Sequence, residues 1–185
     1  MSTHYLSDEF MSLIRCCCEK ADKEHMLAWL YDEDRWPSGS AGGKVTENPE
    51  YRMKSLYLFE TSVDDFRFDE DIVFLFKATM GDNDISIDNY EKISPADISS
   101  ITDKEKTRIL SFKIISDTPN SNYNGNTYVD TMNKAAIDKF IEITHERYKE
   151  CVGDMFGGTV PSIFTDEPQF THKKTLPFAE SEVDV

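Results

Sequence analysis

The stretch from Thr159 to Phe170, TVPSIFTDEPQF, constrains the fold of this chain more than any other. Residues 160–164 form a short, mostly apolar run, which is typical of a strand buried on both faces. Asp166 and Glu167 follow it, and Pro168 lacks a backbone donor and ends the strand there. In barrels of parallel strands the active site lies where the strands end, so this pattern predicts a carboxylate-bearing site. A strand that simply ends in a polar turn is the alternative.

A second carboxylate cluster follows a second apolar run. Ser7 is predicted to cap a helix that runs to about Lys23, and residues 25–31, HMLAWLY, then predict a buried strand. Carboxylates and arginine hydrogen-bond the hydroxyl groups of sugars, and an indole stacks on a sugar ring. A solvated acidic turn, neutralised by its arginine, is the alternative. The residues predicted to bind substrate here are Asp32, Glu33, Arg35 and Trp36, and Asp166 joins them from the other strand end.

The loop at residues 116–126 is rich in asparagine and contains Tyr123. Such residues are common turn formers, which accounts for most of them. Amide groups beside an aromatic ring also suit a polyol. We therefore predict that this loop forms the rim of a sugar site and that Tyr123 binds substrate.

The next segment predicts an amphipathic helix. Its expected buried stripe leaves His145 outside, and the position where a zinc protease would carry its second histidine is Lys149. We therefore expect His145 to bond a neighbouring backbone group rather than a metal. The expected stripe consists of Ile137, Phe140, Ile141, Thr144 and Tyr148.

Two long motifs resemble one family of enzymes. Residues 29–43 are similar to its YDEDxWPSGxAGG segment, and residues 128–170 carry a VDxMN segment, a THExY helix and an FTDEP strand in the same order. These are motifs of large bacterial glycoside hydrolases of the α-L-rhamnosidase type, family 106. The resemblance covers residues 5–52 and 107–170. It implies a (β/α)8 barrel, inversion of configuration, calcium in the site and a second catalytic glutamate on a later strand.

Glycoside hydrolysis needs one carboxylic acid that protonates the leaving oxygen and one carboxylate that activates water or attacks the sugar. Glu167 is the predicted general acid. Asp166 faces the other way if the strand continues, so it is expected to bond a loop or backbone group. The partner carboxylate is not identified in this sequence.

Chain length sets a limit on the barrel. A complete (β/α)8 barrel needs about 250 residues, whereas this chain has 185. The predicted fold is therefore α/β, a partial (β/α)8 barrel of about the first half with an antiparallel β insertion, and the chain is expected to be a fragment of a longer protein. The expected parts are barrel units at 1–56, the insertion at 57–106, further barrel units at 107–170 and a polar tail at 171–185.

Composition excludes several partners. The net charge of −15 argues against nucleic acid and anionic membranes, which need a positive surface, whereas a neutral oligosaccharide tolerates it. We find no transmembrane stretch, signal peptide, disulfide framework or zinc spacing in the sequence. These features predict a soluble cytoplasmic chain, and a longer parent with its own signal would be secreted or periplasmic.

Two other interpretations stay open. The chain could be a non-catalytic carbohydrate-binding or remnant protein derived from such a hydrolase, or an unrelated α/β interaction protein. In either sugar interpretation the open edges of an incomplete sheet predict self-association.

Overall fold

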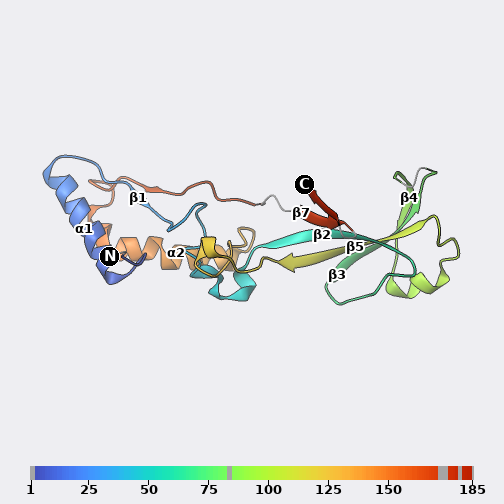
Figure 1. Cartoon of the computed structure of the whole chain (residues 1–185). Coiled ribbons are helices and arrows are strands. Elements are labelled where there is room, and N and C mark those ends of the chain that lie inside the picture. Colours follow the sequence, from blue (N-terminus) through green and yellow to red (C-terminus); the bar gives the residue numbers. More distant parts are fainter. Residues whose placement is uncertain (1–2, 83–84, 171–174, 179–180, 185) are drawn as a thin grey trace. The chain divides into compact units, whose positions relative to one another are not determined.

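The computed structural model describes residues 3–82, 85–170, 175–178 and 181–184. The chain divides into two compact units, one made of Met1–Met53 and Asp117–Phe170 and the other of Lys54–Ser116 and Thr171–Val185. The helices belong to the first unit, and an antiparallel sheet belongs to the second (Figure 1). Among the described residues, no helix combines the length and the apolar character that a membrane span requires.

Helix α1 (Asp8–Lys23) begins and ends as the sequence predicts. The Oγ of Ser7 accepts a hydrogen bond from the N–H of Phe10 at 3.2 Å, which caps the first turn. Acidic residues in the first turn and lysines in the last complement the helix dipole. The helix buries Met11 and Cys18 against the rest of this unit.

The second helical segment is broken into α2 (Lys134–Ile143) and α3 (His145–Val152). Asn133 caps α2, and Thr144 separates the two helices with its Oγ1 donating to the carbonyl of Phe140 at 2.6 Å. The expected stripe is wrong at Ile141, which is exposed. The buried side chains are Ala136, Phe140, Thr144, Tyr148 and Val152, a stripe of four-residue steps.

Strands β1 (Leu30–Tyr31) and β6 (Ile163–Phe164) form a two-stranded parallel sheet. Leu30 lies opposite Ile163, and Tyr31 lies opposite Phe164. The strands are short, and Phe164 is half exposed, so burial on both faces is not what holds them. They pack through one side on α1 and α3, in a cluster made of Met11, Cys18, Leu30, Tyr148, Val152 and Val160.

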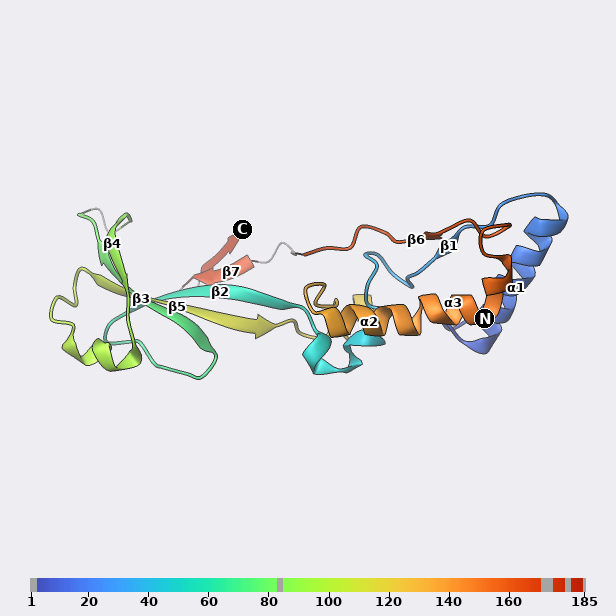
Figure 2. The ribbon, with the colours of Figure 1, turned by 180° about the vertical axis from the view of Figure 1, so that it is seen from behind.

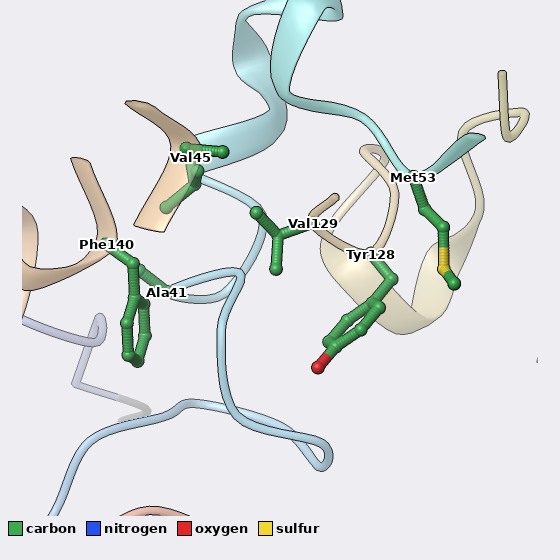
Figure 3. Close-up of a cluster of buried hydrophobic side chains, with 7 residues drawn as sticks. Ala41, Val45, Met53, Tyr128, Val129 and Phe140 are labelled. Atoms are coloured by element: carbon green, nitrogen blue, oxygen red, sulfur yellow. The ribbon is translucent and has the colours of Figure 1, made fainter. Parts of the chain in front are cut away.

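A second cluster lies where α2 meets two loop regions (Figure 3). Figure 3 shows Val45 and Val129, which come from distant parts of the sequence, beside Phe140 of α2. Short 3-10 turns shape the surrounding chain. The buried members are Ala41, Val45, Met53, Tyr128, Val129, Ala136 and Phe140, and the turns of this unit are η1 (Val45–Glu47), η2 (Pro49–Tyr51), η4 (Ser121–Tyr123) and η5 (Gly153–Met155).

The second unit is built on a four-stranded antiparallel sheet, seen from both sides in Figures 1 and 2. Its strand order is β2-β5-β3-β4, so β2 and β4 form the edges, and β5, the last of the four along the chain, lies between β2 and β3. Val63, Leu75 and Ile109 are buried on one face beneath a turn, η3 (Pro95–Ser100), and its neighbours. The strands are β2 (Lys54–Ser62), β3 (Ile72–Met80), β4 (Ile87–Lys92) and β5 (Thr107–Ser116).

The predicted partial (β/α)8 barrel is wrong. The structure has a small antiparallel sheet, a two-stranded parallel sheet and few helices. The segment at 107–115 was expected to be a third parallel barrel strand, but β5 pairs antiparallel with both β2 and β3. An aliphatic run such as RILSFKII signals burial, and burial carries no information about the direction of the neighbouring strand.

Two further expectations fall partly on undescribed residues. Within the insertion expected at 57–106, β3 pairs antiparallel with β4, and residues 83–84 between them lie outside the described residues. In the tail expected at 171–185, β7 (Thr175–Phe178) pairs antiparallel with β8 (Ser181–Asp184). Residues 171–174, 179–180 and 185 of that tail lie outside the described residues.

Candidate functional site

The ends of β1 and β6 bring the two carboxylate motifs together. Because these strands are parallel and in register, their carboxyl ends lie side by side. The N–H of Asp32 donates to the carbonyl of Phe164 at 3.3 Å, and the N–H of Ser38 donates to the carbonyl of Asp166 at 2.9 Å. These contacts bring the two carboxylate motifs to one edge of the two-stranded sheet.

Asp32 is the centre of a buried polar network. Its side chain has no solvent exposure, and its Oδ1 accepts a hydrogen bond from Ser38 Oγ at 2.7 Å. Its Oδ2 lies 2.6 Å from Thr165 Oγ1 and 2.9 Å from His145 Nε2. These three partners come from the loop after β1, from the end of β6 and from α3. Both oxygens of Asp32 are therefore occupied within the protein, where they hold three segments in place.

His145 has a role that the sequence did not indicate. We expected it to bond a neighbouring backbone group, and it instead contacts the carboxylate of Asp32. Its ring also packs edge to face on Phe140, with centroids 5.5 Å apart. The helix breaks at Thr144, and α3 begins at His145. The sequence pattern predicted one continuous helix and therefore did not indicate this position of His145.

The Asp32 network predicts a specific pH dependence. Burial alone would raise the pKa of Asp32, but the hydrogen bonds from His145, Thr165 and Ser38 outweigh it and hold that pKa below its ordinary value. When the pKa of a carboxyl group is lower in the folded than in the unfolded chain, the group stabilises the fold at any pH above its unfolded pKa of about 4. This stabilisation is lost as the pH falls through the folded pKa. We expect urea unfolding to show a loss of stability below about pH 4 that is smaller in Asp32→Asn.

The control for this measurement is Glu47→Gln, which removes an exposed carboxylate of the same unit that has no hydrogen-bond or ion-pair partner among the described residues. This variant should keep the pH slope of the original chain. An unchanged slope in Asp32→Asn would contradict the role given to the network.

Glu33 organises the loop that follows it. The carboxylate is almost fully buried and accepts hydrogen bonds from five backbone N–H groups at 2.5–3.0 Å. Burial raises the pKa of Glu33 above its ordinary value, and the backbone N–H groups, led by that of Gly42, act in the opposite direction. The carboxylate therefore accepts the hydrogen bonds that fix the backbone of this loop. The donors are the N–H groups of Asp34, Gly39, Ser40, Ala41 and Gly42.

The same loop is tied to the asparagine-rich loop. Gly43 has φ +88°, and a Cβ placed there would lie 2.2 Å from the carbonyl oxygen of Tyr123. Asn124 Nδ2 donates to the carbonyl of Gly42 at 2.9 Å and to Asp34 Oδ2 at 3.1 Å. The small residues at 39–43 therefore allow two loops to approach closely.

A hollow of about 520 Å³ opens beside this loop pair. Its lining is polar and combines both charge signs with two amides. The side chains of Lys44, Glu47 and Asn126 make no hydrogen bond or ion pair with any described residue, so they are free to meet a ligand. The lining residues are Thr3, His4, Tyr5, Asp34, Arg35, Gly42, Lys44, Glu47, Asn124 and Asn126.

The hollow gathers only part of the predicted site. Arg35 lines it, with its Nε 3.5 Å from Asp34 Oδ2. Tyr123 is not in the lining; it is partly buried and packs against Tyr128, with ring centroids 5.8 Å apart. Trp36 is 54% exposed and is likewise not in the lining.

Asp166 and Glu167 lie at the end of β6, away from the lining of the hollow. Asp166 Oδ2 accepts a hydrogen bond from Tyr31 Oη at 3.3 Å, and the N–H of Asp166 donates to Ser38 Oγ. Glu167 is exposed and has φ +42°, a left-handed conformation that is uncommon for a residue with a side chain. Its predicted role as general acid stays a prediction.

Sequence reasoning missed Lys44, Glu47 and His4 as pocket residues. Each lies outside the two carboxylate motifs, and nothing in its spacing marks it. The asparagine-rich loop, by contrast, was predicted as a rim, and Asn124 and Asn126 line the hollow.

A metal site is not evident within the described part of the chain, where no three His, Cys, Asp or Glu side chains lie close enough to share an ion. The acidic side chains at the ends of β1 and β6 are used in internal hydrogen bonds or stand alone. Calcium therefore rests on the family resemblance.

No protein-family model matches this chain, nor does any curated protein or solved structure.

Proposed function

We propose that this chain binds a saccharide in the hollow formed by residues 3–5, 34–47 and 124–126. The observation that carries the proposal is the set of free polar side chains on its lining, Lys44, Glu47 and Asn126. Together they offer an ammonium donor, a carboxylate acceptor and an amide that is both. Neighbouring hydroxyl groups of a sugar are donors and acceptors at once, and this mixture suits them.

The charges of the lining favour a neutral ligand. The lining contains two cationic side chains, Arg35 and Lys44, and two anionic ones, Asp34 and Glu47, so its formal charges balance when His4 is neutral. An anionic ligand would meet two carboxylates in a chain with a net charge of −15. The volume of about 520 Å³ also falls within the usual range of about 300–1,000 Å³ for small-molecule sites.

Hydrolysis of a rhamnoside-like glycoside is a second candidate. The observation that favours it is the left-handed backbone at Glu167, because strained residues cluster at functional sites. The resemblance of the FTDEP and YDEDRWPSGSAGG segments to α-L-rhamnosidases of family 106 supports the same reaction. In this candidate Glu167 protonates the leaving oxygen, and another carboxylate must activate water.

The binding proposal predicts an effect of single lining residues. Titration with rhamnose-containing oligosaccharides, followed by calorimetry, should show saturable heat that Asn126→Ala weakens about three- to tenfold, because one hydrogen bond to the ligand is worth about 1 kcal/mol. Asn122→Ala is the matched control, since Asn122 lies in the same loop but does not line the hollow. Equal binding by both variants would place the sugar elsewhere.

The same mixtures separate binding from turnover. Release of free sugar that is lost in Glu167→Gln supports the hydrolytic candidate, with a contribution of roughly 10²–10⁴-fold from general acid catalysis. Saturable binding without release assigns the chain to the non-catalytic class. Absence of any heat with the oligosaccharides contradicts both candidates.

A further inference from the structure

The sheet of the second unit has one covered face and one face that leaves large apolar side chains exposed, and β7 lies against its edge strand β2. Val63, Leu75 and Ile109 lie on the covered face. The register of the strands places a set of large apolar side chains on the opposite face, which we call face A. Face A is defined by Leu56, Phe74, Phe76, Tyr90, Phe112 and Ile114.

Face A is a largely apolar surface, and Lys92 Nζ lies 5.0 Å from the centroid of its Phe74 ring. Phe112 packs edge to face on Phe74 and on Phe76, with ring centroids 6.5 and 5.8 Å apart, and Phe76 packs on Tyr90 at 6.2 Å. Tyr90 is nonetheless 69% exposed and Ile114 48% exposed. A contiguous apolar patch of this kind on a folded chain marks an interaction surface.

We propose that face A binds face A of a second copy of this chain, so that two sheets pack face to face. Sheets that pack in this way align their strands within about 30° and bury interdigitating side chains between them. A two-fold axis parallel to the strands and through the middle of face A would relate the two copies. It places β2 of one copy over β4 of the other. Each row of paired residues across the sheet then faces the same row of the second copy.

The charges at the edges of face A complement one another in this arrangement. Glu60 on β2 pairs with Leu110, Leu110 with Phe76, and Phe76 with Lys92 on β4, so Glu60 and Lys92 occupy the two ends of one rung. The two-fold axis brings Glu60, whose Oε1 lies 3.7 Å from Arg108 Nε of its own chain, opposite the partner's Lys92. Two such pairs form, one at each edge of the interface, and they select this register.

The area of face A is sufficient for a specific dimer. Strands of 9 and 10 residues lie in a sheet of four strands. At about 3.4 Å per residue and 4.8 Å between strands, one face covers roughly 30 by 19 Å. Two such faces bury about 1,100 Å² together, which exceeds the roughly 1,000 Å² that a specific interface needs.

The test is sedimentation equilibrium of the full chain over a wide range of concentrations. We expect a monomer–dimer equilibrium that added salt strengthens, because salt screens the repulsion between two chains of charge −15. Leu56→Lys and Ile114→Lys should each weaken dimerisation at least tenfold, since they place an ammonium in an apolar interface. Both side chains are about half exposed, at 52% and 48%, so the fold should tolerate the change, as thermal melting would verify.

Two further variants test the specificity and the register. Phe68→Lys is the control, because Phe68 is 53% exposed in the same unit but lies outside the sheet, and it should leave the dimer unchanged. Lys92→Glu should weaken dimerisation roughly two- to fivefold, and Glu60→Lys in the same chain should restore part of it. A chain that stays monomeric at every concentration overturns the proposal, and so does a dimer that tolerates both lysines on face A.

Discussion

Replacement of Glu33 by glutamine is expected to lower the free energy of unfolding by about 3–5 kcal/mol, the range typical of a buried charge interaction broken on one side. Five backbone N–H groups converge on the Glu33 carboxylate, and the side chain is only 4% exposed. Glutamine keeps the shape but has one acceptor oxygen, and its NH₂ group would point at N–H donors. Several buried donors are then left without an acceptor.

Urea unfolding at neutral pH measures this loss. Glu50→Gln is the matched control, because Glu50 is exposed, lies close by in the sequence and uses no side-chain hydrogen bond within the described residues. That variant should stay within about 0.5 kcal/mol of the original chain. A Glu33→Gln protein as stable as the Glu50→Gln protein would show that the loop does not depend on the carboxylate.

The second large effect is expected at Gly43. Gly43→Ala should cost about 3–4 kcal/mol, because a methyl group there collides with backbone and the residue must also keep a positive φ. The nearest atom, the carbonyl oxygen of Tyr123, would lie 2.2 Å from the new carbon. The two loops must then separate, so the saccharide binding that we propose for the hollow should weaken together with stability.

Gly125 offers a control that isolates the backbone strain. It has φ +86°, close to the +88° of Gly43, but no atom lies within 4 Å of a Cβ added there. Gly125→Ala should therefore cost only about 1 kcal/mol, the cost of the left-handed conformation. Equal losses in the two variants would attribute the Gly43 effect to strain alone and would remove the close approach of the loops from the explanation.

Part of the fold could be predicted because local chemistry decides it. Ser7 and the acidic residues after it begin α1, and Lys77 and Thr79 alternate with apolar neighbours, which indicates a strand with one solvated face. The barrel prediction was wrong because local chemistry does not decide the direction of a strand. Whether residues 107–115 run parallel or antiparallel to their neighbours depends on contacts with β2 and β3, which lie far away in the sequence.

The site shows the same division. The two carboxylate motifs do lie together, because parallel strands in register bring their ends to one edge. What each carboxylate does could not be read from the motif, because that depends on where the following loop folds back. At Glu33 the loop returns within nine residues and occupies the carboxylate with backbone donors. At Asp32 the partner His145 comes from 113 residues away.

The antiparallel ladder of β2 and β5 has a consequence for the order of folding. The first unit is discontinuous, and its halves must meet across an excursion of more than sixty residues. Pairing of Lys54 with Ser116 at the open end of this ladder holds Met53 beside Asp117, whose N–H donates to the Met53 carbonyl at 2.8 Å. Once β2 and β5 have paired, residues 54–116 no longer add to the length of the loop between Asp32 and His145. The conformational entropy lost when these two side chains come into contact is therefore smaller.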